Sequence, residues 1–231
     1  MPRLRVLAYN VHGFRGGVRR VARTAAAEGP DVALLNEAKG RFTLQRFARA
    51  TGMGVAAHGL RLFGGVPNAV LLRPPWRPVH AQVIRFSRTG GLPPRGAIVV
   101  RARRAGVPVT LVTVHLGLSD AERPPHAREL TDALAGMDPP IVLGGDLNEG
   151  PQGKAAAWIA DRLWDAWPRA ASGPMSDSGE TFPAREPRAR IDYLFVSEEV
   201  RVERCWLGAT PDATEASDHL PLFADVVVGE E

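Results

Sequence analysis

The chain has 231 residues, of which 45% are hydrophobic and 23% charged, and its formal net charge is +4. This composition is ordinary for a soluble globular protein with room for a large core. A single cysteine, Cys205, excludes an intramolecular disulfide and a thiolate metal cluster, and no run of roughly 18 apolar residues is present to form a membrane-spanning helix.

Almost all of the basic residues are arginines, since Lys39 and Lys154 are the only lysines. Arginine can hold a phosphate through two parallel hydrogen bonds, which is consistent with an anionic partner. The same composition is equally expected from a GC-rich genome. The first nine residues are too short and too polar for a signal peptide, so we expect a cytoplasmic protein, and we expect a monomer.

Apolar runs of strand length alternate with helical patterns along the whole chain, which predicts one α/β domain over residues 1–231. The predicted strands are Arg5–Tyr9, Val32–Asn36, Asn68–Leu72, Val79–Phe86, Ala97–Arg101, Thr110–His115, Ile141–Leu143, Ile191–Val196, Arg201–Leu207 and Leu222–Val228. The predicted helices are Val18–Glu28, Phe42–Ala50, Ala127–Ala135 and Ala155–Leu163. Residues 89–94 and 171–187 are rich in turn-forming residues and predict loops.

The two halves of the chain contain a weak internal repeat. In each half a strand ends in polar residues, a helix follows, and a strand preceded by proline ends in an acid. The first unit runs from Val6 to Glu37 and the second from Val112 to Asp146. Such a pair would place four polar strand ends at one site, although chance could also produce the pattern.

Polar residues at the ends of buried strands are held rigidly, as a catalytic site requires. Each one alone has a simpler explanation: Asn10 can cap a turn, and His115 can be a core histidine with its hydrogen bonds satisfied. Together they form a set of carboxylates, amides and imidazoles that can bind a hard metal ion and activate water. The set is Asn10, His12, Glu37, Asn68, His115, Asp146, Asn148, Asp192, Asp218 and His219.

The local sequences around these residues resemble, in order and spacing, the endonuclease/exonuclease/phosphatase family, whose fold is that of deoxyribonuclease I. GDLN or SDH alone is a weak pattern, but seven such segments in the right order are a specific one. The segments are Tyr9–Gly13 (YNVHG), Leu34–Glu37 (LLNE), Asn68–Leu71 (NAVL), Val112–Leu116 (VTVHL), Gly145–Asn148 (GDLN), Arg190–Phe195 (RIDYLF) and Ser217–Pro221 (SDHLP).

The resemblance implies an α/β four-layer sandwich, in which two packed mixed β-sheets are flanked by helices. It also implies metal-dependent cleavage of a phosphate ester at one end of the sandwich. By matched position, Glu37 would bind the ion, with Asn10 and Asp218 nearby. Mg²⁺ or Mn²⁺ is the expected cofactor, because such ions prefer oxygen ligands and need only one or two carboxylates from the protein.

The same resemblance implies catalytic roles for five further residues. Asp146 and Asn148 would orient the attacking water and hold the phosphate. His219 would face the scissile phosphate, polarised by Asp192, and His115 would contact a phosphate oxygen or assist the leaving group.

Three residues are expected at the substrate. Asn68 lies in a matched segment, and Arg95 resembles an arginine that some family members direct at phosphate, although a surface role for Arg95 is nearly as well supported. Several family branches have Asp or Asn where this chain has His12, so His12 is expected to touch phosphate and not metal, or to have a structural role beside Gly13.

We therefore expect a hydrolase, specifically a phosphodiesterase or nuclease of low sequence selectivity, because few aromatic residues are available to stack on bases. The alternatives are a phosphomonoesterase, a hydrolase of phosphoinositide or sphingomyelin headgroups, and a non-catalytic binding module on the same fold. The sequence contains no H-E-x-x-H segment and no P-loop, which argues against a hydrolytic zinc site and against nucleotide hydrolysis of the P-loop type.

Overall fold

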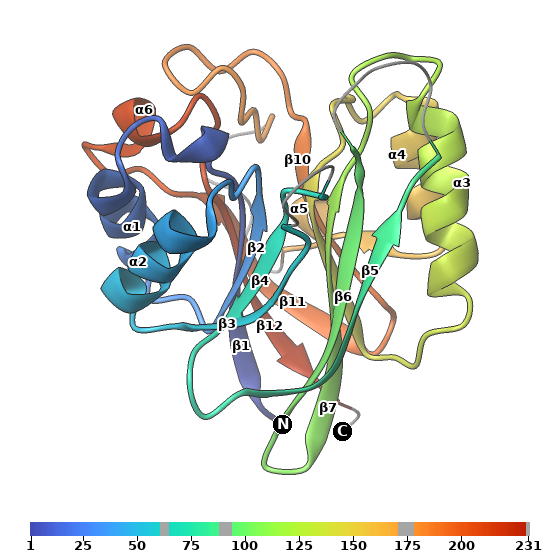
Figure 1. The fold of residues 1–231 in the computed structure, drawn as a ribbon. Helices are drawn as coiled ribbons and strands as arrows, with labels where there is room; N and C mark the ends of the chain where they lie inside the picture. Colours follow the sequence, from blue (N-terminus) through green and yellow to red (C-terminus); the bar gives the residue numbers. More distant parts are fainter. Residues whose placement is uncertain (61–64, 88–93, 171–177, 230–231) are drawn as a thin grey trace.

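The structure is a computed structural model that describes all residues except 61–64, 88–93, 171–177 and 230–231. Its described strands form two six-stranded mixed sheets that pack face to face, and helices cover the outer face of each sheet (Figure 1). The four-layer α/β sandwich expected from the sequence is therefore confirmed.

The first sheet has the strand order β11-β12-β1-β2-β4-β3. Its strands are β1 (Arg3–Asn10), β2 (Val32–Asn36), β3 (Gly54–His58), β4 (Ala69–Leu72), β11 (Val200–Leu207) and β12 (Leu222–Val228). The second sheet has the order β5-β6-β7-β8-β10-β9. Its strands are β5 (Arg77–Arg85), β6 (Gly96–Arg104), β7 (Val107–His115), β8 (Ile141–Asp146), β9 (Trp164–Asp165) and β10 (Asp192–Val196).

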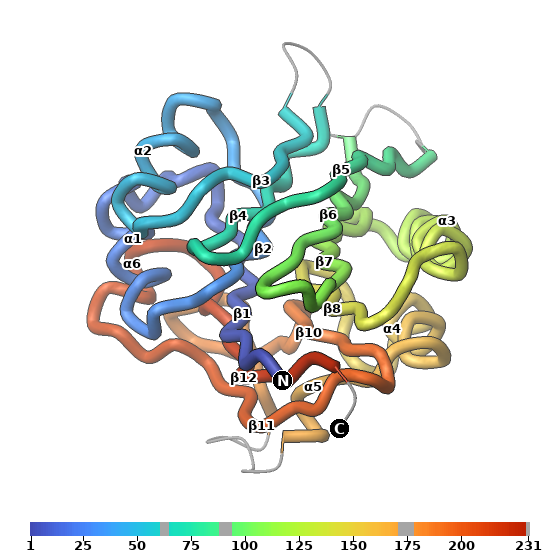
Figure 2. Tube along the Cα trace, turned by 90° about the horizontal axis from the view of Figure 1, so that it is seen from below, coloured from blue at the N-terminus to red at the C-terminus, as the bar shows by residue number. Residues whose placement is uncertain are grey.

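Helices form the two outer layers, as the view from below shows (Figure 2). On the side of the first sheet lie α1 (Val18–Ala26), α2 (Arg41–Thr51) and α6 (Ala213–Ala216), and on the side of the second lie α3 (Arg123–Leu134) and α4 (Lys154–Ala160). Two short elements complete the fold: the 3-10 turn η1 (His12–Phe14) and α5 (Ala166–Arg169). None of the described helices is long and apolar enough to cross a membrane.

The two sheets repeat the same arrangement of strands. β1 is parallel to β2, which is antiparallel to β4, and in the second sheet β7 is parallel to β8, which is antiparallel to β10. In the parallel pairs, Asn10 lies opposite Asn36 and His115 lies opposite Asp146. The internal repeat in the sequence is therefore a repeat in the fold, and it brings polar strand ends to one edge.

Three apolar clusters hold the layers together. The central cluster fills the space between the sheets, with residues such as Val6, Leu34 and Ile98 fully buried. A second cluster packs α1 and α2 on the first sheet around Phe47, and a third packs α3 and α4 on the second sheet around Leu130. Burial of this kind is the main favourable contribution to folding, and it leaves the polar strand ends rigidly supported.

The sequence-based boundaries fail mainly where glycine or small residues carry a strand. β8 continues to Asp146 through Gly144 and Gly145, three residues beyond its predicted end at Leu143. A side chain at Gly144 would meet Leu194 and Leu34 at 2.8 and 3.0 Å, so glycine is needed for the two sheets to approach. β3 was not predicted, because Gly54–His58 has no alternation of apolar and polar residues. The predicted loops at 89–94 and 171–187 lie partly outside the described residues.

Candidate active site

Asp146 lies at the centre of a network of buried polar groups at one edge of the two sheets. Its Oδ2 accepts a hydrogen bond from Asn10 Nδ2 at 2.9 Å and lies 3.3 Å from His115 Nε2 and 3.8 Å from His219 Nε2. Its Oδ1 accepts from the backbone N–H of Asn148 at 2.8 Å. Burial alone would raise the pKa of Asp146, but the two histidines and this N–H hold the pKa well below its usual range. Asp146 is therefore a rigidly held carboxylate at neutral pH.

His219 precedes β12 and is held by Asp192, the first residue of β10. His219 Nδ1 lies 2.7 Å from Asp192 Oδ2, and the other ring nitrogen faces Asp146 and Asn10. Burial alone would lower the pKa of His219, but the carboxylates of Asp192 and Asp146 raise it to about 9. The Phe182 ring, 4.9 Å from the imidazole between centroids, covers one side of His219. His219 is therefore a fixed imidazolium with one N–H directed at Asp146.

His115 and Arg95 form the second half of the network. Arg95 Nη1 lies 2.7 Å from His115 Nδ1 and 2.6 Å from Nε2, and both residues are buried. Burial, with the neighbouring guanidinium, lowers the pKa of His115 more than Asp146 raises it. A neutral ring that accepts from Arg95 at Nδ1 and donates from Nε2 to Asp146 accounts for the Nδ1 contact and for the Asp146 contact.

Asn68 and Asn148 are anchored to the backbone around this network. Asn68 Nδ2 donates to the carbonyl of Gly96 at 3.1 Å, beside Arg95, while its Oδ1 is buried and without a hydrogen-bond partner among the described residues. Asn148 has a φ of 51° and donates from Nδ2 to the carbonyl of Leu116 at 3.1 Å. Non-glycine residues in this backbone region are uncommon and are often found at functional sites.

Glu37 lies at the rim of the network, directly after β2. Its φ is 53°, its backbone carbonyl accepts from Gly13 N, and its carboxylate accepts from the exposed Lys39 Nζ at 2.9 Å. Partial burial alone would raise the pKa of Glu37, but the Lys39 hydrogen bond and nearby positive charge lower it. Glu37 is thus an accessible carboxylate whose one flexible partner can be displaced.

His12 and Asp218 lie together on the other side of Asn10. His12 Nδ1 is 3.3 Å from Asp218 Oδ1, and the backbone N–H of His12 donates to Asn10 Oδ1 at 3.1 Å. Ser217 Oγ donates to the carbonyl of Asn10 at 2.6 Å and fixes the segment that carries Asp218. The structure therefore connects His12 to a carboxylate that the resemblance assigns to the metal.

Asn36 also belongs to the network, although it was not among the predicted site residues. It is fully buried where β2 faces the second sheet. Its Oδ1 accepts from the backbone N–H of Asp146 at 3.0 Å, and its Nδ2 donates to the carbonyl of Val114 at 2.9 Å. Asn36 thereby joins the two sheets directly beneath the carboxylate. Its place at the end of a buried strand, next to Glu37, is the signal in the sequence that could have identified it.

Two groups of residues offer ligands for a metal ion. Asp146, Asp192 and His219 have potential ligand atoms within 4.8 Å of one another. In the metal-free protein, however, Asp192 lies 2.7 Å from His219 Nδ1 and the pKa of His219 is raised, so a metal ion at Nε2 would have to displace a proton. The accessible oxygen atoms at the rim, above all those of Glu37, fit a hard divalent ion that retains several waters.

The chain matches a model of the Endonuclease/Exonuclease/phosphatase family over residues 7–219, which is most of its length. A search of curated proteins finds no significant match.

Solved structures of this fold superpose closely on the chain. The endonuclease/exonuclease/phosphatase from Bacteroides vulgatus is 18% identical with a TM-score of 0.83, and the match covers 99% of this chain and 100% of that one. The mannosyl-6-phosphatase Bt3783 of Bacteroides thetaiotaomicron VPI-5482 is 20% identical with a TM-score of 0.82, covering 97% and 99%. The protein from Beutenbergia cavernae DSM 12333 is 25% identical with a TM-score of 0.73, covering 99% and 72%.

Proposed function

Because the chain belongs to the endonuclease/exonuclease/phosphatase family, we propose that it is a divalent-metal-dependent phosphoesterase that cleaves phosphodiesters with low sequence selectivity. The observation that carries the proposal is the buried carboxylate of Asp146, held between two histidines of opposite preferred charge. A binding module has no need for an acid, a base and a cation fixed at this spacing.

Glu37 would hold the ion, with Asn10 and Asp218 nearby, and the chemistry of the donor set favours Mg²⁺ or Mn²⁺. When bound, such an ion neutralises phosphate charge and lowers the pKa of coordinated water. Lys39 would then give up its hydrogen bond to Glu37, which costs little because the lysine is exposed.

The protein groups themselves would act on the water and the phosphate. Asp146 is a carboxylate that can accept a hydrogen bond from water and direct it, with Asn148 beside it. His219, as an imidazolium oriented by Asp192, would donate a hydrogen bond to a phosphate oxygen and offset the negative charge that develops there.

Arg95 and His115 would contact the phosphate from the opposite side. The Arg95 guanidinium keeps its charge when buried, and its remaining donors have no hydrogen-bond partner among the described residues, so they can form a two-pronged hydrogen bond with phosphate. Asn68 would contribute on the same side, because its buried Oδ1 has no partner among the described residues and can accept a hydrogen bond from a water molecule or a substrate hydroxyl group. His12 would touch phosphate from the side of Asp218.

A phosphomonoesterase is the second candidate. It is supported by the likeness in fold to a mannosyl-6-phosphatase, and nothing in the network itself distinguishes a monoester from a diester. Nucleic acid is favoured as the substrate by the basic, arginine-rich chain.

A turnover screen tests the proposal. The protein is assayed with single- and double-stranded DNA, RNA, bis(p-nitrophenyl) phosphate, sugar phosphates, phosphoinositides and sphingomyelin, in Mg²⁺, in Mn²⁺ and in EDTA. We expect metal-dependent cleavage of the diesters. Asp146→Asn and His219→Ala should each lower kcat by roughly 10²–10⁴-fold, and the double variant should lose much less than the product. Absence of turnover on every substrate would sink the enzyme assignment, and cleavage of monoesters alone would favour the second candidate.

A further inference from the structure

A pocket of about 470 Å³ lies beside the active-site network, and the two share a wall. Its lining includes His12 and Asp218, which separate it from Asn10 and His219. The remaining walls come from the start of α1, from the 183–185 segment and from α6, so that three separate parts of the chain meet there.

Three guanidinium groups line the pocket: Arg15, Arg20 and Arg185. Arg15 contacts His12 Nε2 at 3.2 Å and forms no ion pair with any carboxylate among the described residues. Arg20 has a buried Nε without a hydrogen-bond partner there, its contact with Asp212 being 3.7 Å long. Arg185 pairs with Glu215, but both side chains are at least half exposed, so this pair is weak and exchangeable.

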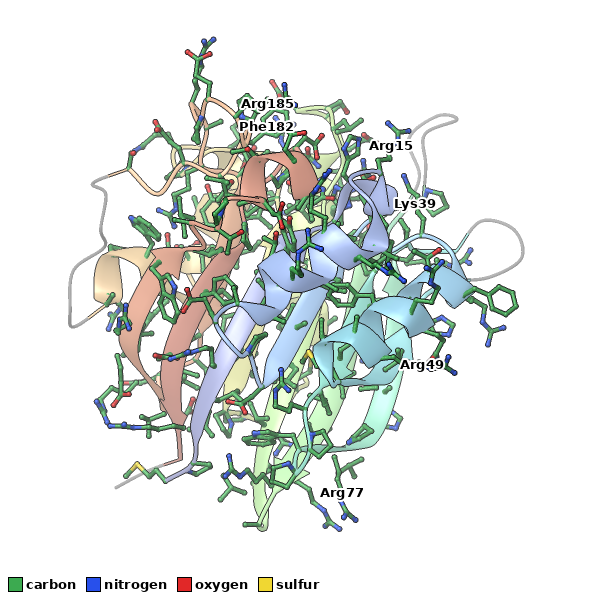
Figure 3. The ribbon with its side chains drawn as sticks, turned by 90° about the vertical axis from the view of Figure 1, so that its left-hand side faces the viewer. Arg15, Lys39, Arg49, Arg77, Phe182 and Arg185 are labelled. Atoms are coloured by element: carbon green, nitrogen blue, oxygen red, sulfur yellow. The ribbon has the colours of Figure 1, made fainter. Side chains whose placement is uncertain are left out.

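The backbone gives this pocket a fixed shape. His12, Gly13 and Phe14 all have positive φ values, an uncommon run that turns the chain sharply before Arg15. A Cβ on Gly16 would lie 2.3 Å from the carbonyl oxygens of Glu215 and Ala216, so the α1 wall is pressed against the α6 wall. Arg15, Lys39 and Arg185 gather at one end of the molecule, while Arg49 lies well away from that end (Figure 3).

We propose that this pocket binds a second phosphate group of the substrate, next to the phosphate that is cleaved. The inference rests on the proposed function and narrows its substrate class to compounds with two neighbouring phosphates. An arginine-lined pocket with one unpaired guanidinium is suited to a dianion, because arginine binds phosphate oxygens in pairs. The terminal phosphate of an oligonucleotide and the second phosphate of a small bisphosphate are both dianions and present the same chemistry to it.

The experiment compares substrates that differ only in the second phosphate. The nucleotide arm compares the thymidine dinucleotide TpT with pTpT and TpTp, which carry an additional 5′- or 3′-terminal phosphate. The small-molecule arm compares fructose 6-phosphate with fructose 1,6-bisphosphate. The wild-type ratio of kcat/KM with and without the second phosphate should be roughly tenfold or more in one arm, on the scale of charged hydrogen bonds. The arm that shows the ratio identifies the source of the phosphate.

The variant R15Q/R185Q should bring that ratio close to one. R49Q removes a charge from the exposed outer face of α2 and should keep the wild-type ratio. Three results would contradict the proposed phosphate pocket. They are a wild-type ratio near one in both arms, a wild-type ratio retained in R15Q/R185Q, and an equal loss of the ratio in R49Q.

Calorimetry in EDTA measures the affinity for TpT and for pTpT, and so tests phosphate binding by the pocket without any need for turnover. If wild-type protein binds pTpT more tightly than TpT and R15Q/R185Q does not, the proposed phosphate pocket is supported even if no substrate is cleaved. Turnover without any preference for the second phosphate would contradict the proposed phosphate pocket but would leave the proposed phosphoesterase activity supported.

Discussion

Two histidines face the same oxygen of Asp146, yet their surroundings favour opposite charge states. His219 has Asp192 on its far nitrogen and a raised pKa, whereas His115 has a guanidinium against its ring and a lowered pKa. Residues of one type thus acquire different chemistry from their neighbours, as is common at catalytic sites.

This difference predicts the pH dependence of folding stability in the metal-free protein. Because the pKa of His219 is raised to about 9, its contribution is fully present below about pH 6.5 and is lost as the pH rises through 9. His115 behaves in the opposite way, since its lowered pKa stabilises the fold above about pH 6.5 and the contribution is lost as the pH falls. The free energy of unfolding, measured by chemical denaturation in EDTA from pH 5 to 10, tests both pH dependences.

Asp192→Asn should remove most of the decline in stability between about pH 6.5 and 9, because the neutral amide no longer raises the pKa of His219. The control is Asp212→Asn, which removes a partly exposed carboxylate from a surface ion pair. If the alkaline decline persists in Asp192→Asn, another group is responsible.

Glu37→Gln tests the metal assignment. The amide keeps the size of the side chain but removes its charge, so the Mn²⁺ concentration for half-maximal activity should rise at least about tenfold, with partial rescue at high metal. Glu186→Gln, at an exposed ion pair, provides the matched control. If the Mn²⁺ dependence of activity is unchanged in Glu37→Gln, Glu37 is not a ligand of the metal ion.

At the scale of the elements, strand ends carry the predictable part of the site. β2 and β12 run over the residues predicted for them, because each is a short apolar run between polar residues. Asn10, His115 and Asp146 were expected together from the repeat of strand and helix, and the structure brings them into contact.

Contacts between elements distant in the sequence could not be predicted in the same way. Asn36 looks like an ordinary strand end until the second sheet supplies Asp146 and Val114 as its partners. Arg101, Arg103 and Arg104 lie close together in the sequence, as a binding site for a polyanion would require, but they lie toward the end of β6 opposite Arg95, where Arg101 donates to the carbonyl of Asp138. Sequence spacing does not show which end of a strand faces the site.

Asn36→Leu tests the connection between the sheets. The substitution keeps the volume but leaves the N–H of Asp146 and the carbonyl of Val114 buried and unpaired, so we expect a loss of about 2–4 kcal/mol in the free energy of unfolding. A fall in kcat should accompany it, since Asp146 loses its support. Thr113→Val, which removes a single hydroxyl from the same network, should cost less. Wild-type stability and kcat in Asn36→Leu would contradict the role given to this residue.

At the scale of the whole molecule, the distribution of charge predicts how binding responds to salt. If nucleic acid is the substrate, affinity for oligonucleotides should fall steeply as KCl rises, because bound counterions are released. The slope of the logarithm of affinity against the logarithm of KCl concentration should be smaller in R15Q/R185Q. It should be unchanged in R103Q/R104Q, since Arg103 and Arg104 lie at the opposite end of the second sheet. Fluorescence anisotropy at 50–300 mM KCl measures it, and an affinity that is insensitive to salt would exclude a nucleic-acid substrate.

The pairing of β1 with β12 has a consequence for how the chain folds. This antiparallel pair joins Arg3 to Val227, so the start of β1 and the end of β12 lie side by side (Figure 1). If a short linker joined the ends and the chain were opened between Glu198 and Glu199, each sheet would come from one continuous stretch of sequence. The slowest contact to close by diffusion would then become a hairpin, and the circular permutant should refold faster in stopped-flow experiments while keeping the same arrangement of Asp146 and His219.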